Sequence, residues 1–555
     1  MNARFRLRDW PPADPTHPKP QFPADHRARP GSLQHGLQCA LLWLLPALAS
    51  AQPNVVNVTA VRVEGNTLLP EKTLTALTSE IAGAQPGLAE LNALAARIQH
   101  AYRVAGYGGV VAYVPAQEAS GGQVVVRVVE GKIAAVKVSG NAHFSTANVR
   151  SGLPNLREGT TPHVREINRD IQLSNDNPAK HLNVSLTAGK EPGAIDAEVS
   201  VSDARPVQYL AGYNNSGTPV TGRHRLSVGI EHANLFGRDH VGTLQFQTSP
   251  GYPERVKIFS AGYRVPLYAH AASFDAFVAH STVSNGTTAT TAGPLSFSGK
   301  GTILGLRANR HLDRIGEYDH HVTLALDRRA YDDDCSLGDF GAAGCGSAAV
   351  DVTTVPVSLS YTGQQGDPEL QFGLSVSLST NAAGSSQRTF EAARPGAKRA
   401  YVLSRLSGFV EKRLPAGRAL TVRAEMQYSA HALITPEKFG IGGASSVRGY
   451  AERELSGDSG AVLRIELSGA SFDWEQAARL RPYLFLDHGR VSNRGAMPCN
   501  GADGAKCELT GAGLGLRMNV QKRATASVDI GRALERGPST ARGDLRGHAA
   551  LNVVF

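Results

Sequence analysis

The residues with the clearest chemical potential are a charged pair in two separate glycine-rich stretches of the chain. One stretch carries four consecutive residues that would form the tip of a long loop: Val447, Arg448, Gly449 and Tyr450. The other is a strand-like stretch that places three residues on one face: Phe485, Asp487 and Gly489. If the loop folds against this strand, Arg448 can form a charge-assisted hydrogen bond with Asp487. The sequence therefore predicts an anchored loop, although the pair could serve the architecture alone, because a buried ion pair is weak evidence for a further role.

Three other motifs resemble catalytic or ligand sites but lack the partners that their chemistry requires. Residues 457–460 are Gly-Asp-Ser-Gly, like the nucleophile string of a serine protease, but no His and Asp in a convincing context accompany them. Residues 511–515 carry alternating glycines within a strand with no helix after it, so close packing explains them better than a dinucleotide. The acidic residues 332–334 lack the ligand spacing of a calcium loop. We therefore expect no enzyme activity, no cofactor and no metal site.

Four cysteines form two close pairs, Cys335 with Cys345 and Cys499 with Cys507. Each pair occurs in a stretch rich in Gly, Ala and Asp that is typical of a loop between strands. In an oxidising compartment, disulfides that close exposed loops explain this arrangement. A zinc site with four cysteine ligands is the alternative, but the tight Cys-x-x-Cys spacing of such sites is missing.

The composition of the 555-residue chain is that of a folded protein without helical membrane spans. Charged residues make up 19% and aromatic residues 6%, and there are 59 glycines, which is too apolar for a disordered chain. The formal net charge of +9 would suit nucleic acid or anionic lipid, but no cluster of Lys and Arg with interleaved aromatic residues is present. Nucleic-acid binding is therefore not expected. The chain also lacks a P-loop, so nothing supports transport driven by ATP.

A short apolar run near the N-terminus indicates export from the cytoplasm. Residues 37–48 are mostly apolar, two arginines precede them, and small residues at 47–51 fit a signal-peptidase site. The run is too short to cross a bilayer. We interpret residues 1–51 as a signal peptide with a long basic first part; a downstream translation start fits the sequence equally well.

Residues 58–205 contain an internal repeat, with a first copy at 58–132 and a second at 133–205. Each copy opens with a strand that ends in a Gly-Asn turn, at Gly65 in the first copy and at Gly140 in the second. Apolar residues at helical spacing follow, and alternating strands close each copy. The pattern predicts two small α+β domains in tandem, each with the element order β-α-α-β-β.

From residue 206 onward, helical spacing disappears, and apolar and polar residues alternate with a period of two. Such alternation fits a soluble β-sandwich or a membrane barrel whose apolar face meets lipid. The strands reach the roughly ten residues that a tilted membrane strand needs, which favours the barrel. The expected fold class is therefore a transmembrane antiparallel β-barrel of about 16 strands at residues 206–555, preceded by two tandem α+β repeats.

The last residue gives a second reason to expect a membrane barrel. The final strand ends on Phe555 at the C-terminus, where an exposed ring would have no purpose in a soluble protein. An aromatic residue at the end of an amphipathic last strand is the signal that bacterial barrel-assembly machinery recognises. We therefore expect Phe555 to act as an assembly signal, with that machinery and outer-membrane lipid as partners.

In combination these motifs resemble the two-partner secretion transporters (the TpsB, or haemolysin activation-secretion, family), which belong to the superfamily of barrels with polypeptide-transport-associated (POTRA) repeats. Five further stretches contribute to the resemblance: Gly106-Tyr107, Pro115–Gln117, Val129–Lys132, Asn214–Gly217 and Asn234–Gly237. The resemblance implies that residues 447–450 form the tip of an in-folded loop, with Asp487 as its partner on the barrel wall. It also implies an outer-membrane location with the repeats in the periplasm. There they would bind an unfolded exoprotein of haemolysin or haemagglutinin type, which leaves through the barrel without ATP.

One departure and two alternatives accompany this resemblance. Many family members carry a helix before the first repeat that plugs the lumen, but here the repeat begins within about ten residues of the expected cleavage site. Either the plug is absent, or the Pro-rich N-terminal stretch conceals an equivalent. A barrel-assembly insertase would use the same parts but usually carries more repeats, so two repeats favour secretion. The other alternative is a passive porin or adhesin whose repeats only anchor it.

Overall fold

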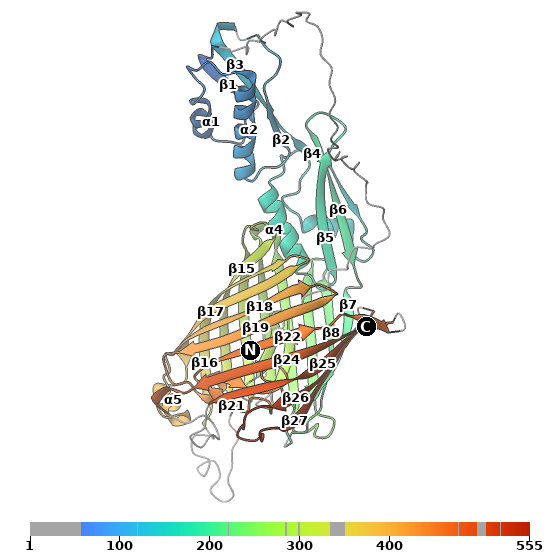
Figure 1. Ribbon diagram of the computed structural model, residues 1–555, viewed down its shortest axis with the longest axis vertical. Coiled ribbons are helices and arrows are strands. Elements are labelled where there is room, and N and C mark those ends of the chain that lie inside the picture. The colour runs from blue at the N-terminus through green and yellow to red at the C-terminus, as the bar shows by residue number, and fades with distance from the viewer. Residues whose placement is uncertain are drawn as a thin grey trace, which may run out of the picture.

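A computed structural model describes residues 57–118, 120–219, 221–283, 286–297, 300–332, 350–474, 477–496, 507–521 and 523–555. Two small α+β units lie one after the other on one mouth of a β-barrel (Figure 1). We call this mouth the repeat-side mouth and the opposite one the far mouth. The expected signal peptide and three cysteines lie outside the described residues: Cys335, Cys345 and Cys499. No helix of the described part is long and apolar enough to cross a membrane.

The first unit has the β-α-α-β-β order that its sequence pattern predicts. Its elements are β1 (Ala60–Glu64), α1 (Glu71–Thr78), α2 (Leu88–Val104), β2 (Val110–Tyr113), η1 (Ser120–Gly122) and β3 (Gln123–Glu130). Strand β3 lies between β1, its parallel neighbour, and β2, its antiparallel neighbour. Helix α2 buries the apolar residues that recur at helical spacing: Leu91, Leu94, Ala95, Ile98 and Tyr102. The Glu90 carboxylate caps its first turn by accepting a hydrogen bond from Gly87 N at 2.9 Å.

The second unit repeats this order and packs on the barrel. Its elements are β4 (Lys132–Ser139), α3 (Thr146–Ser151), α4 (Val164–Asn175), β5 (Lys180–Ala188) and β6 (Ala194–Asp203). Strand β6 is central, parallel to β4 and antiparallel to β5. Backbone hydrogen bonds join the two units: Gly108 N donates to Pro162 O at 2.9 Å, and Val164 N donates to Gly106 O at 2.8 Å. The stretch around Gly106-Tyr107 thus forms the joint between the units.

Sixteen long strands among the described residues form a closed antiparallel barrel. In chain order they are β7 (Val207–Asn214), β8 (Arg225–Leu235), β9 (His240–Thr248), β10 (Lys257–Leu267), β11 (Ala272–Ser281), β14 (Gly301–His311), β15 (Tyr318–Tyr331), β16 (Val352–Gly366), β17 (Leu370–Gly384), β18 (Val402–Leu414), β19 (Arg418–Ser429), β22 (Ser459–Ser468), β24 (Ala478–Ser492), β25 (Glu508–Val520), β26 (Ala524–Ala533) and β27 (Leu545–Val554). A short strand, β23 (Phe472–Trp474), extends the β22–β24 connection at the repeat-side mouth. The barrel closes where the last strand, β27, pairs with the first, β7.

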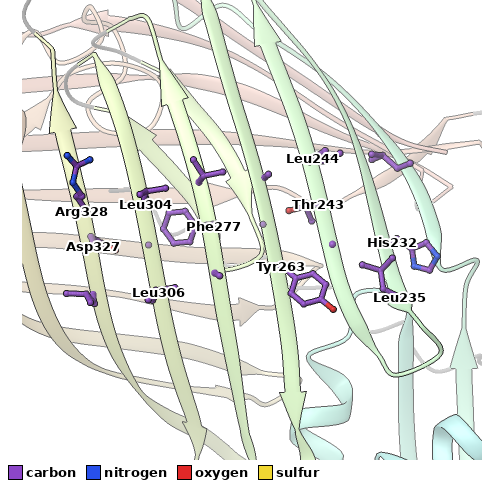
Figure 2. A pocket seen from close by; sticks show the side chains of 18 of the residues that line it. His232, Leu235, Thr243, Leu244, Tyr263, Phe277, Leu304, Leu306, Asp327 and Arg328 are labelled. Carbon is purple, nitrogen blue, oxygen red and sulfur yellow. The ribbon is translucent and has the colours of Figure 1, made fainter.

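Alternation along each strand separates an outer face from a lumen face. On β24, Leu484 and Leu486 are exposed on the outside, whereas Phe485 and Asp487 are buried inside. The outer wall also has an apolar groove of about 820 Å³ that crosses β8 to β16. Figure 2 shows this groove, with Leu304 among the apolar residues that line it. Apolar residues outside and polar residues inside are the pattern of a membrane barrel with a wet channel.

The connections between strands carry the remaining elements. Those toward the far mouth are α5 (Gln387–Ala393), η4 (Thr435–Glu437), β20 (Phe439–Ile441), β21 (Leu455–Gly457) and η5 (Arg494–Ala496). The β11–β14 connection contains a hairpin of β12 (Gly286–Thr290) and β13 (Gly293–Phe297). At the repeat-side mouth, η2 (Tyr268–His270) lies in the turn between β10 and β11.

Candidate functional site: the inward loop and its carboxylates

The segment between β20 and β21, residues 442–454, folds into the barrel, and we call it the inward loop. The side chain of Arg448 is fully buried, although it belongs to a connection at the mouth of the barrel. Its Nε donates to Asp487 Oδ2 at 2.7 Å and its Nη2 donates to Asp487 Oδ1 at 2.8 Å. The Arg448 backbone N donates to the same carboxylate at 3.1 Å. The structure thus brings together the two charged residues that the sequence motifs single out.

Two further carboxylates, which the sequence motifs did not reveal, also hold Arg448. Its Nη1 donates to Glu466 Oε1 at 2.9 Å and to Asp529 Oδ1 at 3.2 Å. Glu466 lies on β22 and Asp529 on β26, both on the lumen face. The one available signal was the alternation of these strands, which places each acidic residue on the polar face. It does not indicate which of the barrel's many polar residues meet the loop.

The cluster around the loop has balanced charge. It contains three arginines and three carboxylates: Arg448, Arg464, Arg517, Glu466, Asp487 and Asp529. Arg517 Nη2 donates to Glu466 Oε2 at 2.6 Å, and the Tyr483 hydroxyl donates to Asp529 Oδ1 at 2.5 Å. Because every carboxylate has at least one cationic or hydroxyl partner, the cluster avoids the large penalty of an unpaired buried charge.

The other two residues of the predicted wall motif also meet the loop: Phe485 stacks on Arg448, and Gly489 leaves space for the loop backbone. The guanidinium carbon of Arg448 lies 3.6 Å from the ring centroid of Phe485, which is a cation–π contact. A side chain at Gly489 would place its Cβ 2.9 Å from Val447 Cγ2. A Cβ at Gly511 would lie 2.0 Å from the carbonyl oxygen of Arg448. These glycines are needed because the loop backbone and the wall touch directly.

The remaining residues of the loop motif connect it to the last strands of the barrel. Gly449 N donates to His548 Nε2 on β27 at 3.2 Å. The Tyr450 hydroxyl lies 2.8 Å from the carbonyl oxygen of Thr510 and 2.9 Å from that of Glu535. The loop therefore contacts a continuous sector of the wall that runs from β22 to β27, next to the closure of the barrel.

The Gly-Asp-Ser-Gly string at residues 457–460 has a structural environment. Arg394 Nη1 donates to Asp458 Oδ1 at 2.5 Å, and Arg394 Nη2 donates to Asp458 Oδ2 at 3.0 Å. The Ser459 hydroxyl contacts the backbone of Ser429 on the neighbouring strand. Both oxygens of Asp458 are thus engaged in attaching the α5 connection to the base of the inward loop.

Only one of the four paired cysteines belongs to the described part of the chain. Cys507 is disulfide-bonded and packs beside the apolar cluster behind the inward loop, which includes Val491 and Leu509. Its partner is outside the described residues, so the proposed pairing with Cys499 stays a prediction. The same is true of the Cys335–Cys345 disulfide.

A second buried cluster joins the second unit to the barrel. Lys180 Nζ donates to Asp239 Oδ2 at 2.6 Å, and both side chains are fully buried. Lys180 Nζ also donates to Asn148 Oδ1 at 3.1 Å, and the Tyr268 hydroxyl donates to Asp239 Oδ2 at 2.6 Å. Burial lowers the pKa of Lys180, and the charge of Asp239 opposes this effect. The turn that contains Asn234–Gly237 is part of this joint, because Asn148 Nδ2 donates to Gly237 O at 2.9 Å.

The closed barrel, the preceding α+β units and the anchored inward loop define a class of protein, the POTRA-bearing transporters of the bacterial outer membrane. Residues 193–518 match the family of the haemolysin secretion/activation protein ShlB/FhaC/HecB, and residues 56–131 match the ShlB-type POTRA domain. Because the first match spans more than half of the chain, the protein belongs to this family. It is an outer-membrane transporter of two-partner secretion, and its repeats lie in the periplasm.

Individual relatives agree with this assignment. The heme/hemopexin transporter protein HuxB of Haemophilus influenzae is 23% identical over 448 residues, which cover 78% of this chain and 76% of the relative. The outer membrane transporter CdiB of Dickeya dadantii is 23% identical over 451 residues, again 78% of this chain and 76% of the relative. The solved structure of CdiB from Escherichia coli has a TM-score of 0.73 at 20% identity and covers 92% of this chain and 93% of that one. For CdiB from Acinetobacter baumannii, the TM-score is 0.66 at 18% identity, with 91% of each chain covered.

These findings confirm the expected fold class, an antiparallel barrel of about sixteen strands behind POTRA-like repeats. The domain limits at residues 132, 205 and 206 stay a prediction. So do the roles of the loop motif, of Asp487 and of Phe555.

Proposed function

We propose that this transporter exports one large, unfolded partner protein, and that the inward loop controls passage through its lumen. The observation that carries the proposal is the attachment of Arg448 to carboxylates on three wall strands, β22, β24 and β26. A loop that only closed a strand connection would not need a fully buried arginine inside the channel. The relatives HuxB and CdiB are themselves named as transporters, which supports export as the function.

Capture of the client is assigned to the sheet edges of the periplasmic repeats. Strand β2 is an edge strand of its sheet, and its Val111 and Tyr113 side chains are exposed. An extended segment can add to such an edge, where main-chain hydrogen bonds give affinity with little demand on sequence. The backbone joint between the repeats holds β2 in a defined orientation above the second unit. A captured segment would thereby be directed toward the barrel.

Passage requires the inward loop to move, and the chemistry of its attachment permits this. The contacts of Arg448 are charged, and water in the lumen can solvate both partners after they separate. The movement also separates the buried side chains of Val447 and Tyr450 from the apolar cluster behind the loop. We infer that folding of the client outside the cell, rather than ATP, gives export its direction.

The client is inferred to be a large β-rich exoprotein of haemolysin or haemagglutinin type. A chain of that kind can remain extended until it reaches the exterior and then fold progressively. The lipid around the barrel and the machinery that assembles it complete the set of proposed partners. No specific observation favours the insertase or the passive porin over export.

Secretion of a candidate partner tests the proposal, and the first candidate to look for is a large, β-rich, signal-bearing protein encoded by a neighbouring gene. Cells would carry the wild-type protein, no transporter, or Arg448→Ala at matched outer-membrane levels, with Arg479→Ala as a control on the exposed end of β24. We expect Arg448→Ala to lower export by at least about tenfold. Breaking this buried pair leaves uncompensated carboxylates, so the inward loop loses the attachment through which it controls passage. The control should export normally, because the Arg479–Asp473 pair is exposed.

Each other outcome has a definite meaning. Export that is unchanged without the transporter would contradict the proposed function. A client that stays in the membrane would instead support an insertase. If the amount of Arg448→Ala barrel falls while each assembled barrel still exports, Arg448 is structural.

A further inference from the structure

The β12–β13 hairpin is a second element inside the lumen. It connects β11 to β14 at the far mouth, where β11 ends at Ser281 and β14 begins at Gly301. Five residue pairs, from Gly286↔Phe297 to Thr290↔Gly293, form its ladder, with residues 291–292 at the tip. It contacts β9, β10 and β11, and lumen-facing side chains of β9 and β10 form hydrogen bonds with it.

The middle of the hairpin is attached to the wall by hydrogen bonds. The hydroxyls of Ser260 and Thr288 lie 2.6 Å apart, and Ser260 Oγ also donates to Ala289 O at 2.8 Å. Gln245 Oε1 accepts from Thr288 Oγ1 at 3.1 Å and from the Ala289 backbone N. Ser260 and Thr288 are both buried by this contact. The adjacent wall strands β9 and β10 thus each contribute an anchoring side chain.

The tip of the hairpin reaches deep into the channel. Arg264 Nη2 donates to Thr291 O at 2.9 Å, and Arg264 Nε donates to Asp275 Oδ1 at 2.7 Å. These wall residues are close to the repeat-side ends of β10, at Leu267, and of β11, at Ala272. The hairpin therefore extends from the far mouth to about the middle of β10, where its tip lies beside Gly262.

A glycine in the wall, Gly262, leaves space for the tip of the hairpin. A Cβ at Gly262 would lie 2.8 Å from both the backbone N and the Oγ1 of Thr291. Any larger residue at this position would push the tip toward the channel axis. The hairpin also occupies a different sector from the inward loop, which contacts β22 to β27, so the two elements fill the lumen from separate parts of the wall.

We propose that the 286–297 hairpin is a second gate, held by Gln245, Ser260 and Arg264, and that it must withdraw for the client to pass. This inference rests on the proposed export function. The attachments are mainly neutral hydrogen bonds, and water in the lumen can replace them. The hairpin is therefore held more weakly than the inward loop, and less free energy is needed to detach it from the wall.

A reversible covalent lock tests the gate. In the variant Ser260→Cys/Thr288→Cys, the two sulfurs replace hydroxyl oxygens 2.6 Å apart, which is close to the geometry of a disulfide. We expect the oxidised double variant to lose export and a reductant to restore it. The two single variants and a wall-to-wall pair, Thr362→Cys/Ser375→Cys, serve as controls. The hydroxyls of Thr362 and Ser375 lie 3.1 Å apart on the adjacent strands β16 and β17, so this disulfide locks no movable element.

Channel conductance in a planar bilayer separates the gate from the export function, because it needs no client. We expect a higher conductance when residues 286–297 are replaced by a short Gly-Ser linker. The gate is overturned if the locked pair exports like the wall-to-wall pair, or if removal of the hairpin leaves the conductance unchanged. If the wild type itself exports nothing while the conductance change is present, the export function fails and the lumen-blocking role of the hairpin remains.

Discussion

At the scale of single residues, the inward loop depends on the shape of the arginine side chain. Arg448 uses Nε and Nη2 on Asp487 and Nη1 on Glu466 and Asp529, while its plane lies over Phe485. A guanidinium provides this fork in a fixed geometry, whereas a lysine ammonium is a compact point charge on a flexible stem. The loop is therefore fixed by directed hydrogen bonds as well as by charge.

This geometry predicts that Arg448→Lys will behave almost like Arg448→Ala in export. The lysine keeps the positive charge but cannot reach all three carboxylates together. Secretion per assembled barrel is the measurement, with Arg517→Lys as the comparison. Arg517 makes one hydrogen bond to Glu466, at 2.6 Å, so its replacement should be tolerated better. Normal export by Arg448→Lys would show that charge alone holds the loop.

At the scale of elements, the second repeat is attached to the barrel through buried polar contacts at the strand turns. Lys180 on β5 and Asn148 on α3 meet Asp239 and the end of the β8–β9 turn, and Tyr268 of η2 completes the contact. The C-terminal end of α4 adds a further link, because His311 Nε2 lies 2.9 Å from Asp176 Oδ2. These contacts set the orientation of the second repeat on the barrel.

Removal of one charge from this joint should release the second repeat. We expect Lys180→Met to weaken docking by roughly 3–5 kcal/mol, because the Asp239 carboxylate would remain buried without its cationic partner. Protease cleavage of the β6–β7 connection in the full-length protein, measured in detergent, reports the undocking. The double variant Lys180→Met/Asp239→Asn should be cleaved more slowly than the single one, since no unpaired charge remains. Equal, wild-type-like cleavage of both would show that the pair does not hold the joint.

At the scale of the whole molecule, the barrel closes through its two terminal strands. Val554 pairs with Leu210, and Phe555 N donates to Tyr209 O at 3.0 Å. The side chain of Phe555 is 71% exposed. The backbone of the last residue thus takes part in closure, whereas its aromatic ring contributes little packing to the finished barrel.

Because closure uses the backbone of Phe555 and not its ring, we predict that Phe555→Ala lowers the amount of assembled barrel without lowering the stability of the assembled barrel. We expect severalfold less barrel in the outer membrane if, as we propose, the assembly machinery recognises this ring. The melting temperature of the barrels that do form should stay unchanged, since the ring is exposed and the backbone hydrogen bonds are kept. Leu545→Ala is the matched control, because Leu545 is equally exposed, at 70%, at the other end of the same strand. Equal membrane levels of both variants would remove the case for an assembly signal.

The sequence by itself determined the kind of elements, their approximate number and their order. A strand places alternate side chains on opposite faces and a helix repeats every few residues, so both leave a local periodic signal. The Gly-Asn turns at Gly65 and Gly140 also gave a local signal, because each one marks the end of the first strand of a repeat. The Arg448–Asp487 pair could also be predicted, since each residue stands in a distinctive local motif.

The tertiary structure alone decided which residues from distant parts of the chain meet inside the barrel. Glu466 and Asp529 reach Arg448 from 18 and 81 positions away. Lys180 and Asp239 are 59 positions apart, and the inward course of the 286–297 hairpin had no local signal. Such contacts depend on the register of every strand pair and on the tilt with which the sheet closes. Those quantities are set by the whole sheet together, so no single stretch of sequence contains them.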